Sequence, residues 1–95
     1  MKMMLKVGVP AEAGTQAIKN GSMVAALEHT IEQLKPEAAY FFPDEGQRCA
    51  HFVFEMQNQS DIVPTLEPFW MNLDADVSLV PVMNFDDLKA GLARI

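Results

Sequence analysis

The sequence is poor in basic side chains. Its 95 residues hold 7 lysines and arginines against 13 aspartates and glutamates, which gives a formal net charge of -6 at pH 7. Nucleic-acid binding requires clustered lysines and arginines that displace the counterions of the phosphates. Because the basic residues here are scattered along the chain, we expect no DNA or RNA partner.

Cysteine and long apolar runs are also scarce. Cys49 is the only cysteine, which excludes an intrachain disulfide and favours a reducing, cytoplasmic location. Its apolar neighbours indicate a buried, inert thiol rather than a nucleophile. No stretch approaches the ~20 apolar residues of a membrane-spanning helix, and Lys6 stands where a signal peptide has its apolar core. We therefore expect no membrane partner.

The residue patterns of common catalytic and cofactor sites are missing. Two histidines and one cysteine without ligand spacing predict no metal site. The five glycines are dispersed, so no phosphate-binding loop is present and no cofactor is expected. The sequence has no Gly-x-Ser-x-Gly motif of a serine hydrolase.

The first half of the chain predicts a strand, a long helix and a second strand. Residues 3–9 alternate, with Leu5, Val7 and Val9 on one face. Residues 12–35 follow a helical pattern, with a break expected near Gly21, and Pro36 ends that pattern. Residues 38–42 form a short aromatic strand.

The second half repeats this order. Residues 43–46 predict a turn, and residues 48–57 predict the longest strand, so that the two strands form a hairpin. A second helix begins near Ser60, and we expect Pro68 to kink or end it. Residues 76–83 form the last strand, at a sheet edge because of Pro81, and residues 84–94 form a short capped helix.

This order of elements predicts one α+β domain over residues 1–95. It is the ferredoxin-like βαββαβ arrangement, with a four-stranded antiparallel sheet, both main helices on one face and a short helix at the end of the chain. A solvated second face would alternate apolar with strongly polar residues. Cys49, His51 and Val53 lie on that face instead, so we expect it to be covered, most economically by a second copy of the chain.

The chain resembles the dimeric α+β barrel superfamily over about Leu5 to Met83. The resemblance rests on the order of elements, the segment Leu34 to Phe41 (LKPEAAYF), the hairpin, and the closing strand Val77 to Val82 (VSLVPV). The segment 34–41 is similar to small uncharacterised bacterial members related to antibiotic-biosynthesis monooxygenase-like proteins. The resemblance implies a homodimer with its sheets face to face, and a pocket between sheet and helices or within the barrel.

Three functions remain open at this point, because fold analogy carries no mechanism. The first is a homodimer that binds a small apolar or aromatic ligand. The second is a cofactor-independent monooxygenase or isomerase acting on an aromatic or lipophilic molecule, with Tyr40, His51 and Trp70 at its pocket. The third is a structural or regulatory module that binds another protein.

Five residues are candidates for the ligand pocket: Lys6, Tyr40, His51, Glu55 and Trp70. His51 and Glu55 lie about 13 Å apart along one strand, too far for a catalytic dyad. Lys6 and Glu55 are expected to form an ion pair across the sheet. Trp70 is either a pocket wall or an anchor of the core or of the dimer. The hairpin register, which decides whether Tyr40 shares a face with His51, stays open.

Overall fold

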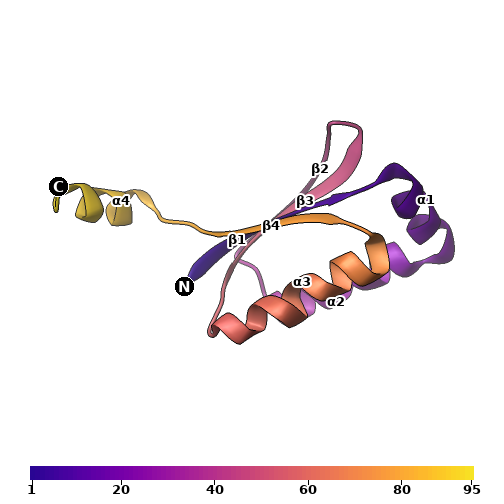
Figure 1. Ribbon diagram of the computed structural model, residues 1–95, viewed down its shortest axis with the longest axis horizontal. Helices are drawn as coiled ribbons and strands as arrows, with labels where there is room; N and C mark the ends of the chain where they lie inside the picture. Colours follow the sequence, from indigo (N-terminus) through magenta and orange to yellow (C-terminus); the bar gives the residue numbers. More distant parts are fainter.

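A computed structural model describes residues 1–95 as two layers and an arm (Figure 1). The elements are β1 (Lys2–Val9), α1 (Ala11–Asn20), α2 (Ser22–Leu34), β2 (Ala38–Asp44), β3 (Gln47–Glu55), a 3-10 turn (Gln59–Asp61), α3 (Ile62–Leu73), β4 (Asp76–Pro81) and α4 (Phe85–Leu92). The four strands form one antiparallel sheet in the order β2-β3-β1-β4. The predicted α+β class and ferredoxin-like topology are therefore confirmed.

The core lies between one face of this sheet and the helices α1, α2 and α3. Every second residue of β1, from Met3 to Val9, is buried there, as the alternation of a strand requires. Phe52 and Phe54 of β3 lie beside them, and Leu66, Phe69 and Leu73 of α3 pack against them. Figure 1 shows α2 and α3 on one side of the sheet and α1 at its end, so no helix covers the opposite face of the sheet.

The break predicted near Gly21 is confirmed. Gly21 has a φ of 81°, the left-handed conformation that glycine adopts without steric cost. Its backbone N–H donates to the carbonyl of Ile18 at 3.3 Å, which ends α1. The Asn20 side chain then accepts a hydrogen bond from the Ser22 N–H at 2.9 Å, and α2 begins.

Of the kink or end expected at Pro68, the end does not occur, and the turn predicted at residues 43–46 is displaced by one residue. α3 does not end at Pro68 but continues to Leu73, because Phe69 and Leu73 are anchored in the core on the far side of the proline. The hairpin turn lies at residues 44–47. Its two central residues are Glu45 and Gly46, with φ values of 50° and 77°, and such paired positive values are typical of the two-residue turn that matches strand twist.

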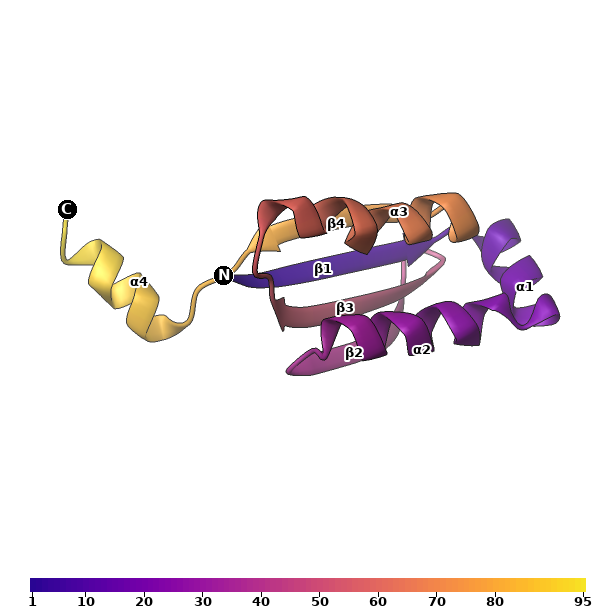
Figure 2. The same cartoon turned by 90° about the horizontal axis from the view of Figure 1, so that it is seen from below.

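α4 stands apart from the two layers. Figures 1 and 2 both show it beyond the end of the sheet, at the end of an extended segment. Its predicted cap is present, since the Asp87 N–H donates to Asn84 Oδ1 at 2.8 Å and the Asn84 N–H donates to Asp87 Oδ2 at 3.1 Å. The arm makes the molecule 51 Å long against 28 and 18 Å in the other directions. No helix combines the length and the apolar character needed to cross a membrane.

Truncation of a core side chain on α3 is expected to destabilise the protein far more than truncation of its exposed neighbour. Leu73 is 1% exposed and Met71 is 77% exposed on the same helix. Leu73→Ala should lower the free energy of unfolding by about 3 kcal/mol, because it removes packed methyl groups and leaves a cavity. Met71→Ala should change it by less than about 0.5 kcal/mol. Urea titrations followed by circular dichroism measure both, and equal losses would contradict the packing described.

Candidate functional site

The strand register brings three of the five candidate residues into one row on the open face of the sheet. Tyr40 lies opposite His51, His51 lies opposite Lys6, and Lys6 lies opposite Ser78. These four residues alternate with the buried ones, so their side chains point away from the helices. The register question left by the sequence is thereby answered: Tyr40 and His51 share a face.

Lys6 is held by a carboxylate at the edge of this row. Its Nζ lies 3.1 Å from Asp44 Oδ2. The hydrogen bond and the charge of Asp44 raise the pKa of Lys6 above its ordinary value. The ion pair expected between Lys6 and Glu55 is wrong, because the register places Glu55 opposite Lys2, two rows from Lys6 along the strands.

His51 packs against an aromatic ring. Its imidazole lies 4.7 Å from the Phe42 ring, centroid to centroid, with an edge-to-face angle of 74°. The side chain is half-buried between this ring and the neighbouring strand. The row thus presents an imidazole, a phenol, an ammonium and a hydroxyl side by side on a surface that is open in the single chain.

The other two candidates lie elsewhere. The Glu55 carboxylate is at the end of β3, 3.2 Å from the amino group of Met1. Trp70 is 45% exposed on α3, in the helix layer behind the sheet. The structure therefore does not bring Trp70 together with Tyr40 and His51, because the sheet separates them.

An apolar cavity lies on the helix side of the sheet, between the sheet and the helices. It has a volume of about 490 Å³, and ten of its twelve lining residues are hydrophobic. The lining residues are Val7, Val9, Met23, Leu27, Phe41, Phe42, Pro43, Arg48, Cys49, Ala50, Phe69 and Leu73. Phe41 explains the opening: its ring packs edge to face on buried Phe52, yet it is 53% exposed because no helix covers this part of β2.

Arg48 is the only charged residue that lines this apolar pocket. It is exposed, so the guanidinium lies where the pocket meets solvent. Nη1 lies 3.4 Å from the Ala11 carbonyl and Nη2 lies 3.4 Å from the Thr15 hydroxyl, both on α1. The ion pairs of the molecule involve Met1, Lys2 and Lys6, so no carboxylate of the chain neutralises Arg48.

Sequence reasoning missed Arg48, although a signal was present. Arg48 shares the strand parity of Ala50, Phe52 and Phe54, the apolar face of β3. When a charged residue stands at the start of a buried strand face, its side chain extends past the core so that the charged group stays in solvent. Such a residue therefore indicates where a cavity in the core would open to solvent. The opening itself depends on how α2 and α3 lie on the sheet, which strand parity does not show.

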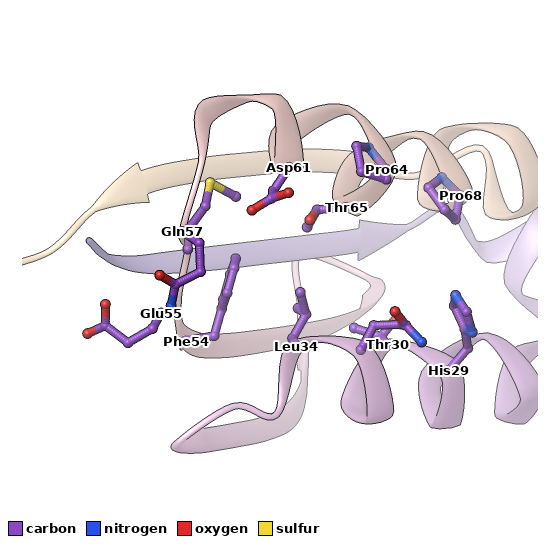
Figure 3. A pocket seen from close by; sticks show the side chains of 12 residues that line it. His29, Thr30, Leu34, Phe54, Glu55, Gln57, Asp61, Pro64, Thr65 and Pro68 are labelled. Atoms are coloured by element: carbon purple, nitrogen blue, oxygen red, sulfur yellow. The ribbon is translucent and has the colours of Figure 1, made fainter.

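A second, polar cleft of about 340 Å³ lies at the other end of the helix layer. Figure 3 shows His29, Thr30 and Leu34 of α2 facing Asp61, Pro64 and Thr65 across it. Two of its polar groups are already occupied. The Thr30 hydroxyl donates to the Ala26 carbonyl at 2.9 Å, and Asp61 Oδ2 accepts from the Asn58 N–H at 3.1 Å.

Neither cavity contains a metal-binding arrangement. No three histidine, cysteine, aspartate or glutamate side chains come together closely enough to hold an ion. Cys49 is buried, and its Sγ lies 3.8 Å from the Gln47 carbonyl and 3.9 Å from the Asp44 carbonyl. The chemistry that the site offers is therefore recognition by apolar contact and one guanidinium.

Removal of the Asp44 charge is expected to lower the pKa of Lys6. In Asp44→Asn the main cause of the raised pKa is lost, so the Lys6 pKa should fall toward 10.5. A lysine whose pKa is raised by folding stabilises the protein fully below its unfolded pKa, and loses this contribution as the pH rises through the folded pKa. The stability difference between wild type and Asp44→Asn should therefore disappear at high pH. NMR titration of the lysine side chains measures the pKa, with Glu37→Gln, which faces Lys2, as a control that leaves Lys6 unchanged.

Comparison with known proteins identifies the fold. No protein-family model matches the chain, and no curated protein matches it either. Among solved structures, the chain is similar to a formyltetrahydrofolate deformylase from Pseudomonas putida KT2440, with a TM-score of 0.57 and 12% sequence identity. The similarity covers 86% of this chain and 29% of that chain, so this chain spans less than a third of the structure that it matches. At this identity the similarity shows a shared ferredoxin-like α+β fold.

Proposed function

We propose that the protein is a homodimer that binds a small apolar or aromatic molecule carrying a carboxylate. The ligand occupies the apolar pocket between the helices and the sheet. The observation that carries this proposal is the single, unneutralised guanidinium of Arg48 at the rim of an otherwise apolar cavity. Arginine binds carboxylates through two parallel hydrogen bonds, which fixes the orientation of the ligand.

The size and lining of the pocket support a small-molecule ligand. Pockets for such ligands usually enclose roughly 300–1,000 Å³, with mostly apolar walls and a few polar groups that set specificity. The volume of about 490 Å³ falls within this range. The Phe41 ring and the Met23 and Leu27 side chains provide an aromatic and an adaptable aliphatic wall.

The negative net charge of the protein makes Arg48 more important for binding an anionic ligand. A net charge of -6 repels anions from most of the surface, so an anionic ligand needs a local cation. The pocket contains no histidine, carboxylate or hydroxyl side chain that would serve as a general acid or base. Binding is therefore favoured over the monooxygenase and isomerase alternatives, which need such a group at the substrate. The single buried cysteine is in keeping with a cytoplasmic location.

The open face of the sheet supports the homodimer. One complete row across the four strands is apolar: Ala38, Val53, Met4 and Val80. A domain of this size buries a modest fraction of its surface, and a second copy would cover this row. The resemblance to the dimeric α+β barrel superfamily agrees with such a pairing.

Neutralisation of Arg48 is expected to weaken the binding of a carboxylate and to spare its neutral isostere. Arg48→Gln should reduce the affinity for naphthalene-2-carboxylate by at least about tenfold, because a charge-assisted hydrogen bond is lost. The affinity for 2-naphthamide should change little. Arg94→Gln serves as the control, since Arg94 is the other arginine and lies on the arm. Isothermal titration calorimetry measures the affinities of wild type and both variants for both compounds, and an equal loss for both compounds in Arg48→Gln would remove the role given to Arg48.

The oligomeric state has its own test. Native mass spectrometry and light scattering of the full chain should show a dimer that dissociates on dilution. A protein that stays monomeric at the highest accessible concentration would refute the homodimer and would leave the ligand pocket standing, because the two lie on opposite faces of the sheet.

A further inference from the structure

We infer that the two copies of the dimer exchange their α4 arms, so that the arm of each copy covers the open sheet face of the other. The α4 arm is defined as residues 83–95. This inference deepens the homodimer put forward above and rests on it. It states which surface covers which, and it replaces the face-to-face stacking of two sheets that the resemblance implies.

The first observation is an apolar stripe on α4 without a partner. Phe85, Leu88 and Leu92 recur at spacings of three and four, so they share one side of α4, and Ile95 follows beyond the end of the helix. They are between 42% and 101% exposed, and no residue of α4 belongs to the core or packs against it. A capped helix that leaves its whole apolar side in solvent lacks the packing that normally stabilises a helix this short.

The second observation is that the open sheet face has one apolar band and charged flanks. The band is the row Ala38, Val53, Met4 and Val80. Lys2 and Glu37, at 2.9 Å, form an ion pair on one side of it, and Lys6 and Asp44, at 3.1 Å, form another on the other side. A second sheet laid flat on this face would remove both ion pairs from water in both copies, which is costly. A single helix covers the band and leaves the flanks solvated.

The dimensions of the two surfaces match. Residues 85–92 span about 12 Å of helix at a rise of 1.5 Å per residue. Four strands at a spacing of about 4.8 Å place the ends of the band roughly 14 Å apart. The helix therefore lies across the strands with its stripe along the band, from the edge strand β2 to the edge strand β4.

The path of the chain favours a second copy over the arm's own sheet. The Val82 N–H donates to the Lys2 carbonyl at 3.0 Å, so the chain belongs to the sheet up to that residue. Only Met83 and Asn84 separate it from α4, and Asn84 is extended, with a φ of -84° and a ψ of -179°. Both views show that this link carries α4 past the end of the sheet rather than back over it.

The area is sufficient for a stable pair. With about 200 Å² for a fully exposed side chain of this size, the stripe of one arm offers roughly 500 Å² of apolar surface. Two exchanged arms and the bands that they cover would then bury on the order of 2,000 Å², which reaches the range of specific, stable interfaces. The exchange is reciprocal, so it closes with two-fold symmetry and leaves no surface free for further growth.

Two glutamate substitutions test the arm and the sheet face that receives it independently of each other. Leu88→Glu places a charge in the stripe, and Val80→Glu places one in the band. The matched controls are Ala90→Glu, on the opposite side of α4, and Ser78→Glu, on the same face of β4 one row away. Each test variant should raise the dimer dissociation constant at least about tenfold, since an unpaired carboxylate is buried, and the controls should behave as wild type. Leu88 and Val80 are both exposed and lie outside the core, and circular dichroism checks that all four variants fold.

Mixing the two test variants gives the decisive result. The Leu88→Glu chain keeps an intact face and the Val80→Glu chain keeps an intact arm, so native mass spectrometry of the mixture should show a heterodimer that neither variant forms alone. If Leu88→Glu dimerises as wild type while Val80→Glu does not, the sheets stack directly; the arm exchange is then wrong and the homodimer stands. If wild type itself is monomeric, the homodimer fails and the exchange fails with it.

Discussion

The alternation of side chains along β1 is the constraint on which the rest of the molecule depends. β1 lies between β3 and β4. Its buried residues Leu5 and Val7 therefore determine which face of both neighbouring strands packs in the core. Its other residues, Met4 and Lys6, are thereby committed to the far face. A chain of 95 residues has enough helix to cover one face of the sheet. Both surfaces proposed for binding follow from this. The pocket lies where the helices cover the sheet incompletely, and the apolar band lies on the face that no helix covers.

Much of the fold can be predicted from the sequence because it depends on local rules. The strand of β1, the break at Gly21, the edge position of β4 and the capped α4 are each specified by residues within one element. Local rules leave alternatives open where distant packing decides between them. Pro68 interrupts the hydrogen bonds of α3, yet the core contacts of Phe69 and Leu73 hold the helix on both sides of it.

The site is less predictable, because it depends on register and on the placement of helices. Polarity alone selected Lys6, Tyr40 and His51, and the register does bring them together. Polarity alone also selected Trp70, which belongs to the other layer. The partner of Lys6 was misassigned since a shift of register changes every pair across a sheet. Arg48 was not selected from the sequence because its importance comes from the apolar pocket beside Phe41. That pocket depends on how α2 packs on the sheet.

The two edge strands share a feature whose consequence concerns aggregation. β2 contains Pro43 and β4 ends at Pro81, so each exposed edge lacks a main-chain donor that an added strand would need. An unprotected edge is a template for open-ended pairing between copies and for fibril growth. With a proline in each edge strand, association through strand addition is disfavoured at both sides of the sheet. A protein that exposes this much apolar side-chain surface can thereby meet other copies through its faces and remain a finite assembly.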